Sequence, residues 1–147
     1  MYYISYQLRV PRSKLSLPLV RRYVLAGFPS PADNYVDTGI DLNEELIQHP
    51  SSTFFLRVRG ESMRDAGILD GDLLIVDRSL NPRPGDIVVA IVDGSFIVKR
   101  LICRKNIFYL EAEHPSYPAI DLSRHKSVQF WGVATFSVHK LIHIRQK

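Results

Sequence analysis

Two short segments of the sequence hold residues that could carry out nucleophilic chemistry together. Ser62 follows Gly60 in a turn-like stretch after an apolar segment, and Lys99 lies in the middle of the apolar run from Ser95 to Ile102. Partial burial of a lysine disfavours its ammonium form and lowers its pKa, which leaves an amine that can accept a proton. A serine hydroxyl becomes a nucleophile when such a base takes its proton. The pattern therefore suggests a Ser-Lys dyad, with Ser62 as nucleophile and Lys99 as general base.

Both residues also have ordinary structural explanations. A serine after Gly-Glu is most often a turn residue or a helix cap, and a lysine on a strand is most often a solvated edge residue. The spacing alone leaves these explanations open beside the catalytic one.

The remaining reactive side chains form no second pattern of this kind. The histidines are scattered, and His139 and His143 are best explained as residues of a flexible tail. Cys103 is interpreted as a small buried hydrophobic side chain, because a thiol nucleophile normally has a histidine base nearby. The sequence has no HExxH, paired CxxC or P-loop motif, so we expect no metal and no cofactor. Four aspartates are interpreted as turn formers, although in apposition they could form a carboxylate pair: Asp70, Asp72, Asp77 and Asp86.

The elements expected to position Ser62 and Lys99 are short β-strands. Asp93-Gly94 lies between two apolar runs, which is a strong signal for a two-residue hairpin that holds Lys99 on a rigid strand. Short strands at close spacing, with no long helical pattern, predict a mainly β protein with a partly rolled sheet. The strands are expected at residues 54–58, 73–76, 87–92, 96–102, 107–110 and 128–138.

Two segments are predicted to precede this sheet. Residues 1–26 form an arm that holds five of the 19 basic residues and none of the 15 acidic ones. Such an arm can meet an acidic surface or nucleic acid, or can simply be solvated. Residues 27–52 form a connector, in which Asp41 and Glu44 are typical of a capping box at the start of a short helix. Residues 53–147 then form the β-rich domain.

The composition narrows the class of protein. A chain of 147 residues, 46% hydrophobic and 23% charged, is typical of a single globular domain. No apolar run approaches the ~18–20 residues that span a bilayer, and the first residues lack the features of a signal peptide, so we expect no membrane association. The single cysteine cannot form an internal disulfide, which fits a reducing cytoplasm.

Four motifs in sequence order resemble the LexA/UmuD family of self-cleaving proteins. They are Gly60-Glu61-Ser62-Met63, Asp70–Asp77, Gly85–Val88 and Val98–Arg100. In addition, the segment from Leu25 to Pro29 is similar to the family's Ala-Gly or Cys-Gly cleavage site. The resemblance extends from about Gly27 almost to the C-terminus.

The resemblance implies a LexA-like C-terminal-domain sheet in which a Ser62–Lys99 dyad cuts the chain between Ala26 and Gly27. Backbone N–H groups of Ser62 and Met63 would stabilise the oxyanion. Only 26 residues precede the cleavage site, too few for the helix-turn-helix domain of LexA-type repressors, so the resemblance is to the UmuD branch.

For that branch the resemblance implies several partners. It implies a homodimer whose cleavage is stimulated by the RecA filament on single-stranded DNA, as part of the SOS response to DNA damage. The 27–147 product would act with a UmuC-like Y-family DNA polymerase in translesion synthesis.

Three other functions remain open at this point. The chain could be a non-catalytic, all-β homodimeric adaptor of a DNA-repair complex, in which Ser62 and Lys99 are structural. Signal peptidases use a similar Ser-Met segment and lysine, but they need a membrane anchor. A DNA-binding repressor remnant would require sequence-dependent DNA binding by the arm.

Overall fold

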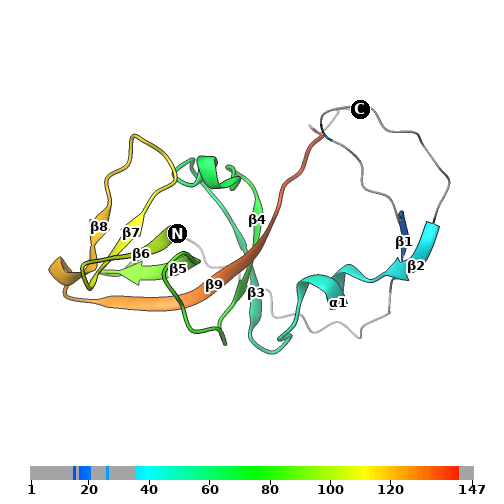
Figure 1. Cartoon of the computed structure of the whole chain (residues 1–147), viewed down its shortest axis with the longest axis horizontal. Helices are drawn as coiled ribbons and strands as arrows, with labels where there is room; N and C mark the ends of the chain where they lie inside the picture. Colours follow the sequence, from blue (N-terminus) through cyan, green and yellow to red (C-terminus); the bar gives the residue numbers. More distant parts are fainter. Residues whose placement is uncertain (1–14, 16, 21–25, 27–35, 143–147) are drawn as a thin grey trace. The chain divides into compact units, whose positions relative to one another are not determined.

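The computed structural model describes residues 15, 17–20, 26 and 36–142 of the chain (Figure 1). These residues belong to two compact units, one ending at Gln48 and the other beginning at His49. The unit that begins at His49 contains both Ser62 and Lys99, whereas Ala26 belongs to the other unit.

The first unit contains a small sheet and one short helix. β1 (Leu17–Val20) pairs antiparallel with β2 (Val36–Ile40). Neither strand follows from the sequence pattern, because each is too short to show apolar alternation. α1 (Leu42–Leu46) begins after Asp41, whose side chain accepts a hydrogen bond of 2.9 Å from the backbone N–H of Asn43. The short helix predicted after Asp41 is therefore confirmed.

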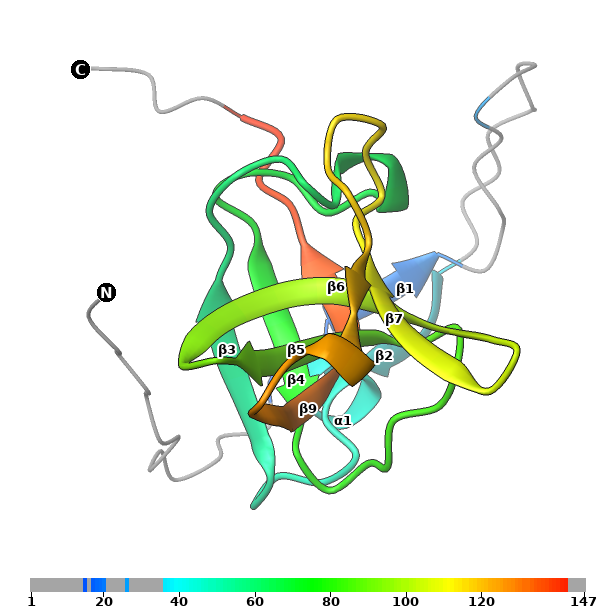
Figure 2. The same ribbon diagram turned by 90° about the vertical axis from the view of Figure 1, so that its left-hand side faces the viewer.

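The second unit is built on a seven-stranded antiparallel sheet in the order β3-β4-β9-β5-β6-β7-β8 (Figure 1). Figure 2 shows the sheet rolled, with β3 and β4 upright while β6 crosses the view. The predicted mainly β fold with a partly rolled, LexA-like sheet is confirmed. The elements are β3 (Thr53–Arg57), the 3-10 turn η1 (Arg64–Ala66), β4 (Leu73–Asp77), β5 (Ile87–Val92), β6 (Ser95–Arg104), β7 (Ile107–Glu111), β8 (Ile120–Asp121), the 3-10 turn η2 (Leu122–Arg124) and β9 (Val128–Val138).

β5 and β6 form the predicted hairpin around Asp93 and Gly94. Both residues have positive φ, 46° for Asp93 and 82° for Gly94, as a two-residue turn of type I′ requires. The register of the pair places Lys99 directly opposite Val88, whose side chain is fully buried. Lys99 therefore comes from a strand paired on both sides, with β5 and with β7.

Two clusters of buried apolar side chains hold this sheet together. The first connects the segment after β3 with β4 and β5, and the second connects β5, β6 and β7. Full burial of one such side chain stabilises a fold by about 1.5–3 kcal/mol. The first cluster consists of Met63, Ile68, Leu74, Val76 and Val89, and the second of Val88, Ala90, Val92, Leu101 and Leu110.

Asp77, the last residue of β4, is a buried carboxylate surrounded by hydrogen-bond donors. Its side chain is 4% exposed. The Ser79 N–H and hydroxyl donate to it at 2.8 and 2.6 Å, the Ser52 hydroxyl donates at 3.0 Å, and His49 Nδ1 lies against its second oxygen. Burial alone would raise the pKa of Asp77, but the hydrogen bonds from Ser79, His49 and Ser52 outweigh it and lower the pKa to about 2. Asp77 was expected to form a turn. Its carboxylate does accept the Ser79 N–H two residues on, and it also fastens the residues before β3 to the end of β4.

The lowered pKa makes the contribution of Asp77 to stability depend on pH. A carboxylate with a depressed folded-state pKa stabilises the fold above its unfolded pKa of about 4, and that contribution is lost as the pH falls toward about 2. Between about pH 5 and pH 2 the wild-type chain should therefore lose about 2 kcal/mol more unfolding free energy than Asp77→Asn does. Urea unfolding followed by Trp131 fluorescence measures both proteins, and parallel pH profiles would contradict the assignment.

Candidate active site

Ser62 lies in the segment between β3 and β4, which is closed at its base by backbone hydrogen bonds. The Val58 N–H donates to the Asp72 carbonyl at 2.9 Å, and the Gly71 N–H donates to the Val58 carbonyl at 2.8 Å. Gly60 has φ +93°, a conformation that side-chain-bearing residues rarely adopt, and its N–H donates to an Asp70 carboxylate oxygen at 2.7 Å. These contacts fix the backbone two residues before Ser62.

Met63 anchors the other side of Ser62. Its side chain is 2% exposed and belongs to the first core cluster. Its carbonyl accepts hydrogen bonds from the N–H groups of Ala66 and Ile68, at 3.1 and 3.2 Å, which turn the chain through η1. Ser62, in contrast, is only half-buried. The buried methionine thus fixes the backbone while the neighbouring hydroxyl stays accessible.

Asp72 fastens the end of this segment to the sheet. Its side chain is 1% exposed and accepts hydrogen bonds from the Leu69 N–H at 2.8 Å and the Ser137 hydroxyl at 3.1 Å, with His139 Nδ1 against its other oxygen. Burial alone would raise the pKa of Asp72, but the hydrogen bonds from Leu69, His139 and Ser137 lower it below the ordinary value. Asp72 closes a turn through the Leu69 N–H, as expected, and it also pairs with His139, just after β9, so the interpretation of His139 as a residue of a flexible tail was wrong. His143 lies outside the described residues.

The structure brings Lys99 and Ser62 together. Lys99 Nζ donates a hydrogen bond of 2.7 Å to Ser62 Oγ, although the two residues are 37 positions apart in the sequence. Alternation along a strand places Lys99 on the same face of β6 as Ile97 and Leu101, both of which pack in the second core cluster. This apolar surrounding leaves the lysine half-buried. Desolvation by burial lowers the pKa of Lys99 below its ordinary value.

Two backbone N–H groups and an aromatic ring lie next to the Ser62–Lys99 pair. Neither the Ser62 nor the Met63 backbone N–H donates a hydrogen bond to any residue that the structure describes. Lys99 Nζ also lies 5.8 Å from the centre of the Tyr117 ring, which the loop between β7 and β8 carries. The contact of Tyr117 with Lys99 was not expected from the sequence, because Tyr117 lies in an irregular loop 18 positions from Lys99. The hydrogen bond from the Gly60 N–H to Asp70 was not expected either.

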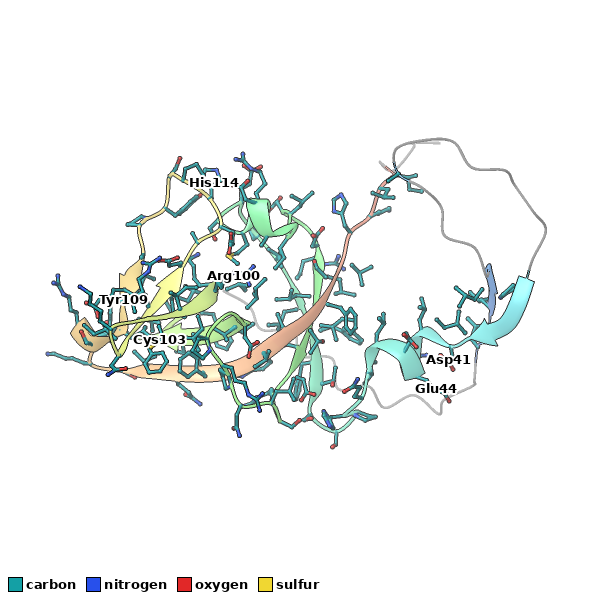
Figure 3. All side chains as sticks on the ribbon, in the orientation of Figure 1. Asp41, Glu44, Arg100, Cys103, Tyr109 and His114 are labelled. Atoms are coloured by element: carbon teal, nitrogen blue, oxygen red, sulfur yellow. The ribbon has the colours of Figure 1, made fainter. Side chains whose placement is uncertain are left out.

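The other reactive side chains lie away from this pair or outside the described residues. Cys103 is exposed near the end of β6, opposite Phe108 on β7, so its interpretation as a buried hydrophobic residue was wrong (Figure 3). Ala26 is exposed, and Gly27 lies outside the described residues. The cleavage site therefore stays a prediction.

The part of the chain that the structure describes has neither a group of metal ligands nor a membrane-spanning helix. Across residues 36–142 and the few described before them, no group of three or more His, Cys, Asp or Glu side chains is placed to hold a metal ion. None of the helices in that same part of the chain is long and apolar enough to cross a membrane.

Comparisons with known proteins identify the family to which this chain belongs. Residues 18–135 match the profile of the family described as Peptidase S24-like. The chain is 45% identical over 125 residues to Protein MucA of Salmonella typhimurium, a match that covers 84% of each chain. It is 44% identical over 128 residues to Protein ImpA of Shigella flexneri, covering 87% of each chain. It is also 42% identical over 122 residues to the LexA repressor of Paracidovorax citrulli, covering 83% of this chain and 54% of the repressor. The chain therefore belongs to the Peptidase S24-like family of SOS-related, self-cleaving serine peptidases, as a UmuD-type member.

Proposed function

We propose that this chain cuts its own peptide bond between Ala26 and Gly27, with Ser62 as nucleophile and Lys99 as general base. The observation that supports this most is the 2.7 Å contact between Lys99 Nζ and Ser62 Oγ. Among the described residues, Lys99 has no carboxylate partner. A half-buried lysine of this kind, beside a half-buried serine at a fixed turn, is a poor arrangement for stability alone, since burial disfavours its charge. A role for Lys99 as the base of a self-cleaving peptidase would explain why its amine is partly buried beside Ser62.

The proposed reaction proceeds in two stages. Neutral Lys99 takes the hydroxyl proton of Ser62 as Oγ attacks the Ala26 carbonyl carbon. The negative oxygen that forms accepts hydrogen bonds from the backbone N–H groups of Ser62 and Met63, and an ester between Ser62 and Ala26 remains after the bond to Gly27 breaks. The Gly27 amine leaves with the proton from Lys99. Water then hydrolyses the ester, with Lys99 again accepting a proton, and frees residues 1–26.

The substrate of this reaction is part of the protein itself. A cleavage segment tethered to the same chain, or supplied by the other subunit of a homodimer, reaches the dyad at a high effective concentration. Ala26 and Gly27 also carry almost no side chain, so a nucleophile can approach the bond between them.

Control of the reaction follows from the charge of Lys99. At neutral pH the neutral amine is a minor form, so we expect slow cleavage until a partner binds the cleavage-competent conformation and shifts the population toward it. By its resemblance to the LexA/UmuD family, we propose that this partner is the RecA filament on single-stranded DNA.

We further propose that the 27–147 product is a homodimer that acts with a UmuC-like Y-family DNA polymerase in translesion synthesis, in the cytoplasm. The resemblance to the UmuD branch supports the polymerase, and the free Cys103 supports a reducing compartment. Exposed apolar side chains on β9 support an interface between subunits, since 39% of Phe130, 45% of Phe136 and 46% of Val138 are exposed.

The proposal predicts the mass and the pH dependence of the product. Purified full-length chain should yield the 27–147 fragment faster at about pH 10 than at about pH 7, because alkaline pH raises the neutral fraction of Lys99. Ser62→Ala and Lys99→Ala should stay intact, and intact-mass spectrometry distinguishes all of these species. A wild-type chain that stays whole at both pH values, even with activated RecA filament, would instead favour the non-catalytic adaptor.

A second prediction concerns the support of the Ser62 turn. Asp70→Ala leaves the Gly60 N–H without its acceptor, so the turn should loosen, and self-cleavage should slow by about tenfold for a loss of about 1.4 kcal/mol. The matched control is Asp86→Ala, whose carboxylate accepts one backbone hydrogen bond from Arg83 at 2.8 Å in a different turn. The control should lose comparable stability and cleave at the wild-type rate. Equal cleavage by both variants would show that Asp70 does not support the site.

A further inference from the structure

The loop between β7 and β8 lies beside the turn that carries Ser62, as both views of the ribbon show (Figures 1 and 2). Glu113 of this loop contacts both the segment that carries Ser62 and the strand that carries Lys99. The Glu113 carbonyl accepts a hydrogen bond of 2.9 Å from the Asp65 N–H, in η1 just after Ser62. The Glu113 carboxylate pairs with Arg100, the residue next to Lys99. The loop is therefore fixed to the segments that carry the nucleophile and the base.

The same loop places an aromatic ring over the base. Lys99 Nζ lies 5.8 Å from the centre of the Tyr117 ring. The His114 ring meets the Tyr117 ring edge-on, with centres 5.1 Å apart and an angle of 83° between the planes (His114 is labelled in Figure 3). Within the loop, the Tyr117 N–H donates to the His114 carbonyl at 3.3 Å, and the Ser116 N–H donates to His114 Nδ1 at 3.1 Å. These contacts hold the ring although 47% of Tyr117 is exposed.

A ring in this position has two opposite effects on the lysine. Its π face attracts an ammonium group, which favours the charged form, whereas its bulk excludes water, which favours the neutral form. The attraction weakens toward about 6 Å from the ring centre, and the contact at 5.8 Å lies near that limit. The attraction is therefore weak, whereas desolvation by burial is the cause that lowers the pKa of Lys99.

We propose that Tyr117 is a positioning residue of the self-cleavage site, whose ring covers the Lys99 amine and limits its access to water. This inference rests on the proposed roles of Ser62 and Lys99. The ring acts through Lys99 alone and takes no part in bond making. The loop thereby helps to set how readily the base becomes neutral.

Other titratable groups occur on the segments packed around Lys99, so a pH profile needs controls for them. The neighbouring β5 residues, Ile87 to Val89, are apolar. The charged or titratable residues are Glu61, Arg64 and Asp65 on the turn from Gly60 to Gly67, Glu113, His114 and Tyr117 on the loop, and Arg100, Cys103 and Arg104 on β6 besides Lys99 itself. Because His114 also contacts the Tyr117 ring, the control for its contribution is NMR titration of the Lys99 side chain, which reports the base alone.

The test is the pH dependence of self-cleavage by the full-length chain carrying Tyr117→Ala, Tyr117→Leu or Tyr117→Phe. Tyr117→Ala should move the midpoint of the rate profile upward by about half a pH unit, so that cleavage at pH 7 is about threefold slower. At high pH, where Lys99 is neutral in every variant, its rate should return to that of the wild type. Tyr117→Phe keeps the ring and should match the wild type, and Tyr117→Leu keeps apolar bulk and should shift less than Tyr117→Ala.

Three results would overturn the inference. They are an unchanged midpoint in Tyr117→Ala, a midpoint that falls in both the alanine and leucine variants, or a rate reduced equally at every pH. The first shows no role for the ring, the second shows that attraction to the ammonium dominates, and the third shows a structural role only.

A measurement without cleavage separates this inference from the proposed function. In the Ser62→Ala chain, NMR titration of the Lys99 side chain should show a higher pKa when Tyr117→Ala is added. If that shift occurs but the wild-type chain never cuts itself, the proposed function fails while the cover over Lys99 stands. If Ser62→Ala and Lys99→Ala abolish cleavage but Tyr117→Ala shifts neither titration nor rate profile, only the inference about Tyr117 fails.

Discussion

The burial of Lys99 beside Ser62 is the constraint on which the proposed chemistry depends. An exposed lysine at neutral pH holds its proton and cannot take another, so a hydrogen bond to serine would activate nothing. Here an apolar strand face removes part of the water around the amine, and desolvation lowers the pKa of Lys99. The same burial that makes the amine a base also makes the ammonium costly, so the site and the stability of the sheet oppose each other.

The fold meets this constraint by placing each partner on a different kind of support. Lys99 belongs to β6, where its backbone position is set by pairing with Val88 of β5, and the pairing of β6 with β7 begins at the next residue, Arg100. Ser62 belongs to an irregular segment, whose backbone must be held by other contacts. The buried side chain of Met63 and the carboxylates of Asp70 and Asp72 supply them. The Ser62 hydroxyl can then remain accessible while these contacts hold its backbone in place.

Much of this arrangement could be predicted from the sequence. The strands Ile87–Val92 and Val128–Val138 match the expected ranges, because both segments are rich in β-branched or aromatic residues, which favour strands. The hairpin at Asp93-Gly94 follows from local turn chemistry. The pairing of Ser62 with Lys99 was also expected, and the contact of 2.7 Å agrees with it. The catalytic roles of the two residues stay a proposal.

The features that were missed depend on contacts between distant segments. Asp72 and His139 lie 67 positions apart, and no local pattern distinguishes a buried, paired aspartate from one in a turn. Cys103 was expected to be a buried hydrophobic side chain because no histidine base lies near it in the sequence, but it is exposed near the end of β6, opposite Phe108 of β7. The pair β1 and β2 joins two short segments without alternation. Tyr117 reaches Lys99 only through the path of the loop that carries it.

The most direct test of the dyad is the reactivity of Ser62 itself, measured independently of the cleavage segment. The full-length chain would be treated with a small sulfonyl fluoride that modifies activated serine hydroxyls, and peptide mapping would locate the adducts. The exposed Ser95 and Ser116 are internal controls in the same molecule. If Lys99 is the base, Ser62 should react ahead of both, its rate should rise with pH, and Lys99→Ala should abolish the difference. Equal reactivity of the three serines, or an undiminished adduct on Ser62 in Lys99→Ala, would contradict the assignment of Lys99 as the base.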